Sequence, residues 1–402
     1  MKWKRNAWNC NEKICWLMWD FKCYTESDTP PVPPCENPMI KHNQYLYEVF
    51  TPSDVIYDYE NAKDYFDEHF KPNAGWCSSF VAWNIYARNL DWTYDDSIQF
   101  VYRTEARTGR FASISVVDSD SHITEKNVDI CGSGGYYDIL PFKCTDWINE
   151  NWVFCNINVV PWNETWWVPT TWTNPAWEDM CMLMICRWVL DNCSSAKEAI
   201  VGLSNFNIYA PALEDLPYEF HFMIGDAEDV YIVDFINNSI EITYVQEWLG
   251  QLPPIMTNFR NANTTLDASG HIDYTTVSEY GSWLERYDLI ADNISDIHTV
   301  QDALDFMSTE LKYTKSYDLT NNRITEFVWD WLTVEDAYLH PDLFDTIRTI
   351  AANRFANRSR DKSSPFYWTW QTTHTAVYDI AEKKLNIRNQ EWNDTYTFRI
   401  PN

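Results

Sequence analysis

The order of strand-forming and helix-forming segments is the feature that most constrains the fold of this chain. Short β-rich runs bounded by polar turns alternate in blocks with runs of helical periodicity. The expected strands occupy 78–92, 97–104, 111–118, 152–161, 220–245, 373–390 and 395–401, and the expected helices occupy 61–70, 180–193, 196–203, 283–294, 300–311 and 342–355. Because strands and helices are grouped separately along the chain, the pattern predicts a layered α+β fold with antiparallel sheets.

Helix ends are also predicted by local chemistry. Ser195 followed by Glu198 forms a capping box for the helix over 196–203. Thr299 and Ser295 are both candidate caps for the helix over 300–311.

The length of 402 residues and the 45% hydrophobic content are enough for a large core. Collagen-like, disulfide-scaffold and mostly disordered classes are therefore excluded. Residues 1–38 form a leader rich in Cys and Trp, and within it 25–38 are rich in Pro and polar residues, which predicts an extended linker. The change to strand-forming sequence near Gly75 is the best internal boundary.

The chain has 10 Gly and 22 Trp, although an average composition of about 7% Gly would give roughly 28 Gly. Our hypothesis is that many Trp stand where a Gly is meant. The codon UGA is translated as Gly in some genetic codes and as Trp in others, so translation with the wrong code produces this imbalance. The alternative is a protein that is genuinely rich in Trp.

The net charge of −29 argues against nucleic acid as a partner, because phosphates would be repelled. No run of 18 apolar residues is present, so no membrane span is expected. The N-terminus carries basic residues but a poor signal-peptide core, since charged residues interrupt it. Cytoplasmic and exported locations both stay open, and a homo-oligomer is compatible with everything in the sequence.

Cofactor and metal motifs are weak. The eight His are isolated from one another, and the eleven Cys include no CxxC pair, so we expect no metal. The Gly cluster at 132–135 lacks the Lys of a phosphate-binding loop, and no GxSxG motif occurs. The sequence therefore predicts no cofactor.

Cys77 is the best candidate nucleophile. It begins an expected strand in NAGWCSSFVA, and ARNLDW follows with Arg88 and Asp91. A strand, a turn and a return strand of this length bring both side chains back beside Cys77. A guanidinium next to a thiol favours the thiolate, and a carboxylate can orient an amine or the guanidinium. The alternative is an inert buried Cys with a surface salt bridge.

These residues resemble the choloylglycine hydrolase family of N-terminal-nucleophile (Ntn) hydrolases, which includes bile salt hydrolases and penicillin V acylases. Further segments are similar to that family in the same order. They are TDWINENWVFCNINVVP, PIMTNFRN, GSWLERYDLI and TWQTTHTAVYDIAEKKL. The similarity extends from about Gly75 to the end of the chain.

The resemblance implies a four-layer αββα Ntn-hydrolase sandwich of two antiparallel sheets flanked by helices. It divides the chain into the leader and linker (1–38), a propeptide segment (39–76) and the hydrolase domain (77–402). Autocleavage before Cys77 would leave a free α-amino group as the base, with a pKa of about 7.7–8.0. The implied activity is cofactor-free hydrolysis of a linear amide C–N bond in a small acyl-amide substrate.

The resemblance also implies roles for the other site residues. Arg88 and Asp91 would support the thiol and the α-amine. Asn258 would hold the oxyanion or the α-amine, and Arg286 would support the site electrostatically. The remaining oxyanion donor of the family corresponds most nearly to Asn158, although strict counting gives Val159, and Asn156 is the fallback on the same strand face.

Each role has a structural alternative. Asn258 could cap a turn, and Arg286 could pair on a helix surface with Glu285 or Asp288. His374 invites comparison with a Cys–His dyad, but in an Ntn enzyme the α-amine replaces that base, so a structural role is preferred. The same fold could also serve an acyltransferase, a cysteine peptidase or a non-catalytic binding module.

The resemblance bears on the excess of Trp. Trp147 and Trp152 fall where the family has Gly, and Trp76 and Trp283 fall in stretches where related sequences often have it. Trp92 and Trp370 match positions where Trp is natural. We therefore expect the excess Trp to occupy turns that need the positive φ of Gly.

Overall fold

The computed structural model describes most of the predicted elements. The described residues are 13–15, 23–25, 39–43, 46–69, 76–92, 98–118, 139–161, 177–209, 218–236, 239–245, 254–259, 265–266, 270–273, 282–311, 371–389 and 394–401. The predicted linker lies almost wholly outside them, as does the predicted helix over 342–355.

A nine-stranded sheet forms one layer. Its strand order is β15-β14-β13-β10-β9-β8-β7-β4-β3. The strands span β15 Ser239–Val245, β14 Val230–Ile236, β13 Tyr218–Gly225, β10 Phe154–Pro161, β9 Asp146–Asn149, β8 Ser113–Asp118, β7 Gln99–Thr104, β4 Leu46–Thr51 and β3 Met39–Lys41. All neighbours are antiparallel except β4 and β7, which are parallel. The predicted antiparallel sheet therefore has one parallel pair, made by a strand that precedes Gly75.

A six-stranded antiparallel sheet forms a second layer, in the order β16-β5-β6-β17-β18-β19. The strands span β16 Ile255–Met256, β5 Trp76–Ala82, β6 Ile85–Trp92, β17 Gln371–Asp379, β18 Lys384–Asn389 and β19 Thr395–Arg399. The C-terminal strands predicted over 373–401 thus join the sheet of the hairpin that carries Cys77, where β17 pairs with β6.

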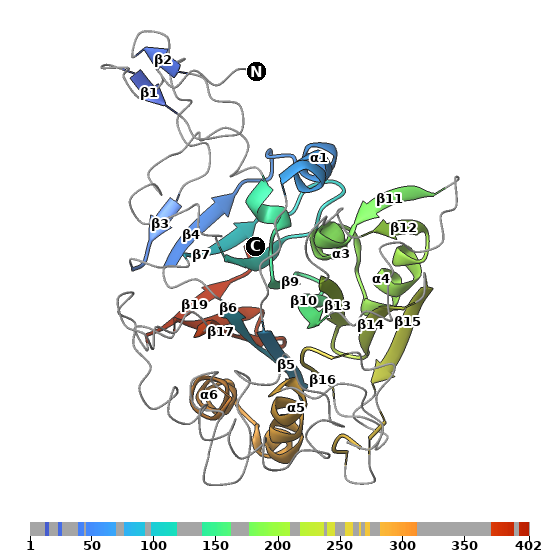
Figure 1. The fold of residues 1–402 in the computed structure, drawn as a ribbon. Coiled ribbons are helices and arrows are strands. Elements are labelled where there is room, and N and C mark those ends of the chain that lie inside the picture. Colours follow the sequence, from blue (N-terminus) through green and yellow to red (C-terminus); the bar gives the residue numbers. More distant parts are fainter. Residues whose placement is uncertain are drawn as a thin grey trace, which may run out of the picture.

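Two sheets and two groups of helices form four layers (Figure 1), and a hydrophobic cluster lies between each pair of neighbouring layers. Side chains of both sheets, such as Tyr86 and Phe154, form an inner cluster between them. The other face of the nine-stranded sheet is covered by α1 (Tyr59–His69), α3 (Ile185–Asn192) and α4 (Ala196–Leu203). The other face of the six-stranded sheet is covered by α5 (Ser282–Asn293) and α6 (Val300–Asp305). The predicted αββα sandwich is therefore present.

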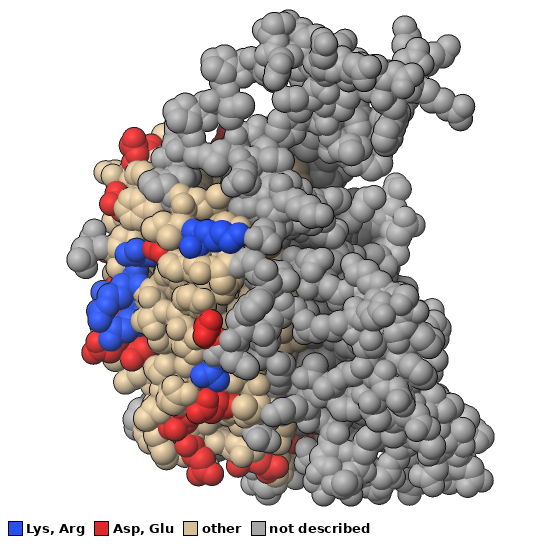
Figure 2. Space-filling view, turned by 90° about the vertical axis from the view of Figure 1, so that its left-hand side faces the viewer, with Lys and Arg blue, Asp and Glu red and all other residues tan. Residues whose placement is uncertain are grey.

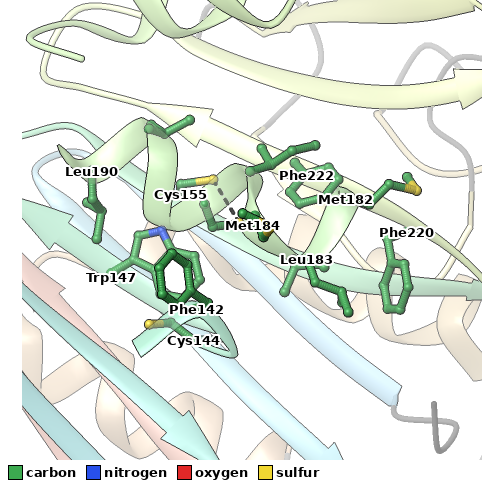
Figure 3. Close-up of a cluster of buried hydrophobic side chains, with 14 of the residues drawn as sticks. Phe142, Cys144, Trp147, Cys155, Met182, Leu183, Met184, Leu190, Phe220 and Phe222 are labelled. Carbon is green, nitrogen blue, oxygen red and sulfur yellow. Dashed lines mark hydrogen bonds between the residues drawn. The ribbon is translucent and has the colours of Figure 1, made fainter. Parts of the chain in front are cut away.

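The helix predicted over 180–193 is wrong in its first part. Met180 and Cys181 belong to β11 (Glu178–Cys181), which pairs in parallel with β12 (Phe206–Tyr209). A short 3-10 helix, η3 (Met182–Met184), follows, and α3 begins only at Ile185. The residues of β11, η3 and the first turn of α3 are buried in the same hydrophobic core, part of which Figure 3 shows. Because this stretch is apolar throughout, its sequence has no period that distinguishes a strand from a helix.

The predicted caps are present. The Ser195 hydroxyl accepts the backbone N–H of Glu198, while the Glu198 carboxylate accepts from Ser194 one residue earlier than a capping box requires. Thr299, not Ser295, caps α6 in a complete capping box with Asp302. A π-helical turn, η7 (Phe306–Glu310), continues that helix.

Only one of the four proposed Gly-like Trp positions has a positive φ. Trp152 lies in a turn at φ +75°. Trp147 is instead fully buried in β9, Trp76 begins β5 and Trp283 lies in α5, so the expectation of a turn is wrong at these three positions. Trp83, in the β5–β6 turn, also has a positive φ of +54°, although it is not among the expected positions.

The described surface carries charges of both signs. On the face in Figure 2, Lys and Arg side chains lie beside Asp and Glu side chains rather than in a separate area. Within the described ranges, no helix is long and apolar enough to cross a membrane.

Candidate active site

The β5–β6 hairpin brings Arg88 beside Cys77, as its sequence predicts. The two strands pair with Ser79 opposite Arg88 and with Cys77 opposite Leu90. The Nη2 atom of Arg88 lies 3.2 Å from the Cys77 sulfur and also donates to the Ile157 carbonyl at 2.8 Å. Cys77 and Arg88 are both almost completely buried.

Asp91 lies on the opposite face of the same hairpin, toward α5. Its Oδ2 accepts from Nη1 of Arg286 at 3.1 Å, and its Oδ1 accepts from the Thr372 hydroxyl. Nη1 of Arg286 also donates to the Ser78 hydroxyl at 2.7 Å. Arg286 is therefore a buried partner of the hairpin, and the alternative of a surface pair on α5 is wrong.

Asn258 holds the backbone nitrogen of Cys77. Its Oδ1 accepts the Cys77 N–H at 2.8 Å and an Arg286 Nη2 proton at 2.7 Å. Its Nδ2 donates to the Val159 carbonyl at 2.6 Å. An amide nitrogen has two protons, so this geometry uses one for Val159 and leaves Nδ2 a second for another acceptor. Asn258 thus links β5, β10 and α5 at one point.

The side chain of Asn158 faces the sheet that carries Cys77, while the side chain of Val159 belongs to the cluster beneath the helices. Asn158 Nδ2 lies 3.3 Å from the Met256 carbonyl and 3.2 Å from the Thr257 carbonyl. Asn158 therefore binds the backbone just before Asn258. Asn156 accepts the Met223 N–H, within the sheet.

A buried network continues from Arg88 on the side away from Cys77. Nη1 of Arg88 forms an ion pair with Asp146 at 2.9 Å. Asp146 also accepts from the Tyr378 hydroxyl and lies 3.3 Å from Nε2 of His374. His374 thus contacts the same carboxylate that pairs with Arg88.

The burial of these groups shifts their protonation. Burial raises the pKa of the Cys77 thiol, and the Arg88 guanidinium acts in the opposite direction. Burial also raises the pKa of Asp91 to about 6, although Arg286 and Thr372 favour its charged form. For Asp146, burial is outweighed by the hydrogen bond from His374 and the charge of Arg88, so its pKa is lowered. Asp146 is therefore the firmly ionised carboxylate of the pair.

A second buried pair supports the segment that carries Asn258. His221 lies on β13 opposite Asn158, its Nδ1 is 3.3 Å from Asp234, and its Nε2 is 2.7 Å from the Thr257 carbonyl. His221 and Asn158 therefore bind the same carbonyl and fix the end of β16 against the nine-stranded sheet.

Sequence reasoning missed several residues of this site. Asp146 is the second residue of TDWINENW, a segment that resembles the family, so the sequence contained a signal for it. Thr372 and Tyr378 lie more than 230 residues away from their partners. The pairing of β17 with β6 places Thr372 beside Asp91, and the packing of the two sheets places Tyr378 beside Asp146 on β9. Among the described residues, no three His, Cys, Asp or Glu side chains are grouped as a metal ion requires.

Part of the chain matches a known family. Residues 79–247 match the model of the linear amide C–N hydrolases, choloylglycine hydrolase family. No curated protein sequence matches the chain. Similar solved structures include the penicillin V acylase from Agrobacterium tumefaciens (16% identity, 81% of this chain and 86% of that one, TM-score 0.38). A mutant conjugated bile acid hydrolase from Clostridium perfringens is also similar (11% identity, 81% of this chain and 92% of that one, TM-score 0.42).

The four layers form the αββα sandwich that the sequence predicts, with a buried Cys near the beginning of a strand. The match over residues 79–247 supports the predicted resemblance to the choloylglycine hydrolase family.

Proposed function

We propose that this chain hydrolyses a linear amide C–N bond with the Cys77 thiol as nucleophile, after cleavage of the peptide bond between Trp76 and Cys77. One observation carries the proposal. Both the nitrogen and the sulfur of Cys77 are bound by buried side chains, Asn258 on the nitrogen and Arg88 on the sulfur. An inert Cys in a strand needs no such support, because its nitrogen pairs with the neighbouring strand.

Asn258 reaches Cys77 from 181 residues away. Its Oδ1 atom accepts, so it suits an N–H donor, and a free α-amine at the same position would donate in the same way. This favours the α-amine as the group that Asn258 holds. Once uncharged, that amine is the base that takes the thiol proton.

The reaction then follows in two steps. The Cys77 sulfur attacks the amide carbon and forms a tetrahedral oxyanion; the C–N bond breaks, and the leaving amine takes the proton from the α-amine. Water adds to the resulting thioester and its proton passes to the α-amine; the C–S bond then breaks to release the acid, and the protonated α-amine returns this proton to the sulfur. Arg88 supports the thiolate throughout because its charge lies 3.2 Å from the sulfur.

The oxyanion needs donors in a dry environment. The second Nδ2 proton of Asn258 is one candidate donor. Asn158 is retained as the other, although its described bonds go to the carbonyls of Met256 and Thr257. The fully buried pair of Asp91 with Arg286 holds the hairpin and Asn258 together.

Hydrolysis of a panel of N-acyl amines and N-acyl amino acids tests the proposal. Wild type should release the free amine, and Cys77→Ala should release none. Cys144→Ala is the matched control, because Cys144 is also a buried free thiol but belongs to the cluster beneath α3. Activity that survives in Cys77→Ala would overturn the proposed nucleophile.

A further inference from the structure

The segment that precedes the cleavage position is part of the folded domain. β4 lies between β3 and β7 in the nine-stranded sheet, and its register with β7 runs from Leu46 opposite Gln99 to Thr51 opposite Thr104. Leu46 and Thr51 are completely buried. Removal of β3 and β4 would expose the hydrogen-bonding edge of β7, which is an aggregation hazard.

The helix of this segment contributes to the same core. In α1, Ala62 is completely buried and Phe66 is 1% exposed. Both belong to the cluster that contains the side chains of α3 and α4. In Figure 1, β3 and β4 form one edge of the large sheet, beside β7. The segment therefore shares its hydrophobic contacts with residues far beyond Cys77.

Buried polar contacts join the segment to α3. The Tyr59 hydroxyl donates to Asp191 at 2.7 Å. Asp191 is ion-paired with Arg187, whose guanidinium lies 5.0 Å from the centre of the Tyr57 ring. Tyr57 also shares a 2.8 Å hydrogen bond with Thr104 on β7. Without the segment, the ion pair of Arg187 with Asp191 would lose two of its aromatic neighbours.

The backbone between β4 and α1 is held by a second arginine. Arg110 donates to the Val55 carbonyl at 2.8 Å and to the Pro52 carbonyl at 3.1 Å. Its guanidinium lies 4.9 Å from the centre of the Tyr57 ring. Arg103 on β7 pairs with Glu48 on β4 at 2.8 Å. The contacts therefore extend over the whole length of the described segment.

We infer that residues 39–69 remain bound after cleavage before Cys77, as a non-covalent light chain of the mature enzyme. This rests on the proposed cleavage, and it adds to the expected propeptide segment (39–76) that its described part is retained. The light chain supplies β3, β4 and α1 to the core, and the heavy chain supplies the site. Their interface is a strand pair, a helix face and the polar contacts of Arg110 and Asp191.

The test cuts the chain without relying on autocleavage. Residues 70–75 are replaced by the recognition sequence of a specific protease in a Cys77→Ala background, and the full chain is purified and cut. Size-exclusion chromatography in native buffer should give one peak that contains both fragments. A light fragment that elutes separately in native buffer would overturn the inference, whether or not wild type cleaves itself.

A matched pair of variants localises the interface in the cut protein. Phe66→Ala should lower the urea concentration at which the light fragment separates, because it removes a buried side chain of α1. Asp64→Ala, on the exposed face of the same helix, should leave that concentration unchanged. Equal effects of the two variants would contradict the proposed interface. In wild type that has cleaved itself, native mass spectrometry should give the 47.6 kDa of the whole chain plus one water.

Discussion

Trp83 offers the clearest test of the idea that Trp occupies Gly positions. Trp83 and Asn84 form the two-residue turn between Ala82 and Ile85, which pair with each other. Trp83 has a φ of +54° and is 50% exposed. In a type II′ hairpin turn, the first central residue has a positive φ and is usually Gly. We predict that Trp83→Gly stabilises the protein relative to Trp83→Ala.

The expected size follows from the backbone. A left-handed conformation costs an L-residue about 1–2 kcal/mol, and Gly does not carry this cost. Gly loses more conformational freedom on folding, which costs roughly 0.5–1 kcal/mol relative to Ala. Both variants lose the same contact of the Trp83 ring with His298. The Gly variant should therefore exceed the Ala variant by about 0.5–1 kcal/mol in the free energy of unfolding.

Urea denaturation followed by circular dichroism measures this difference. The comparison of Gly with Ala isolates the backbone contribution, since both substitutions remove the indole. The same pair of variants at Trp152, where φ is +75°, should give the same sign. At Trp147, which is buried in a strand, Gly should be less stable than wild type. A Trp83→Ala variant that is as stable as the Trp83→Gly variant would refute the reasoning.

Four further predictions concern the site. The raised pKa of Asp91 predicts that activity falls as the pH drops through about 6, because the proton removes the charge that pairs with Arg286; Asp91→Asn should flatten this limb of the rate profile. Because the pKa of Asp91 in the folded protein lies above the ordinary 3.8, its protonated form favours the folded state, and this contribution to stability should be lost as the pH rises from about 4 to about 6. Urea midpoints of wild type and Asp91→Asn, compared over this pH range, measure the loss. Asp146→Asn keeps the shape but removes the charge that orients Arg88, so steady-state kinetics should give a kcat at least about tenfold lower with little change in KM. Asn258→Ala removes the acceptor of the Cys77 N–H, so a gel time course should give slower formation of the heavy chain.

The local parts of the site could be predicted from the sequence. Cys77 and Arg88 are eleven residues apart, and a hairpin of that length has few ways to fold. The strand blocks and the caps at Ser195 and Thr299 were likewise available from local patterns. These features depend on neighbours in sequence, which is why periodicity and turn chemistry find them.

The distant parts could not be predicted in the same way. Asn258 and Arg286 were expected through the family resemblance alone, because no local pattern joins them to β5. Thr372 and Tyr378 were missed, since Thr372 meets Asp91 through the pairing of β17 with β6, and Tyr378 meets Asp146 across the two sheets. The strand β11 was missed because its parallel partner β12 comes 25 residues later, and a run such as MCMLM suits a buried strand as well as a helix.

The contacts of the segment before Gly75 could not be predicted from the sequence either. The change of composition near Gly75 suggested a division, yet β4 and α1 are built into the core of the domain. A parallel pair between a strand before the boundary and one after it leaves no mark in either sequence. Only the burial of Leu46 and Phe66 reveals that the two parts form one unit.

The proposed function requires Cys77 to become the N-terminal residue and the nucleophile. Mass spectrometry and N-terminal sequencing of the purified wild type test this requirement, with Cys77→Ala prepared in parallel. We expect a heavy chain that begins at Cys77 in wild type and an intact 76–77 peptide bond in Cys77→Ala. A wild type that keeps this bond intact, or a Cys77→Ala variant that is cleaved equally well, would contradict it.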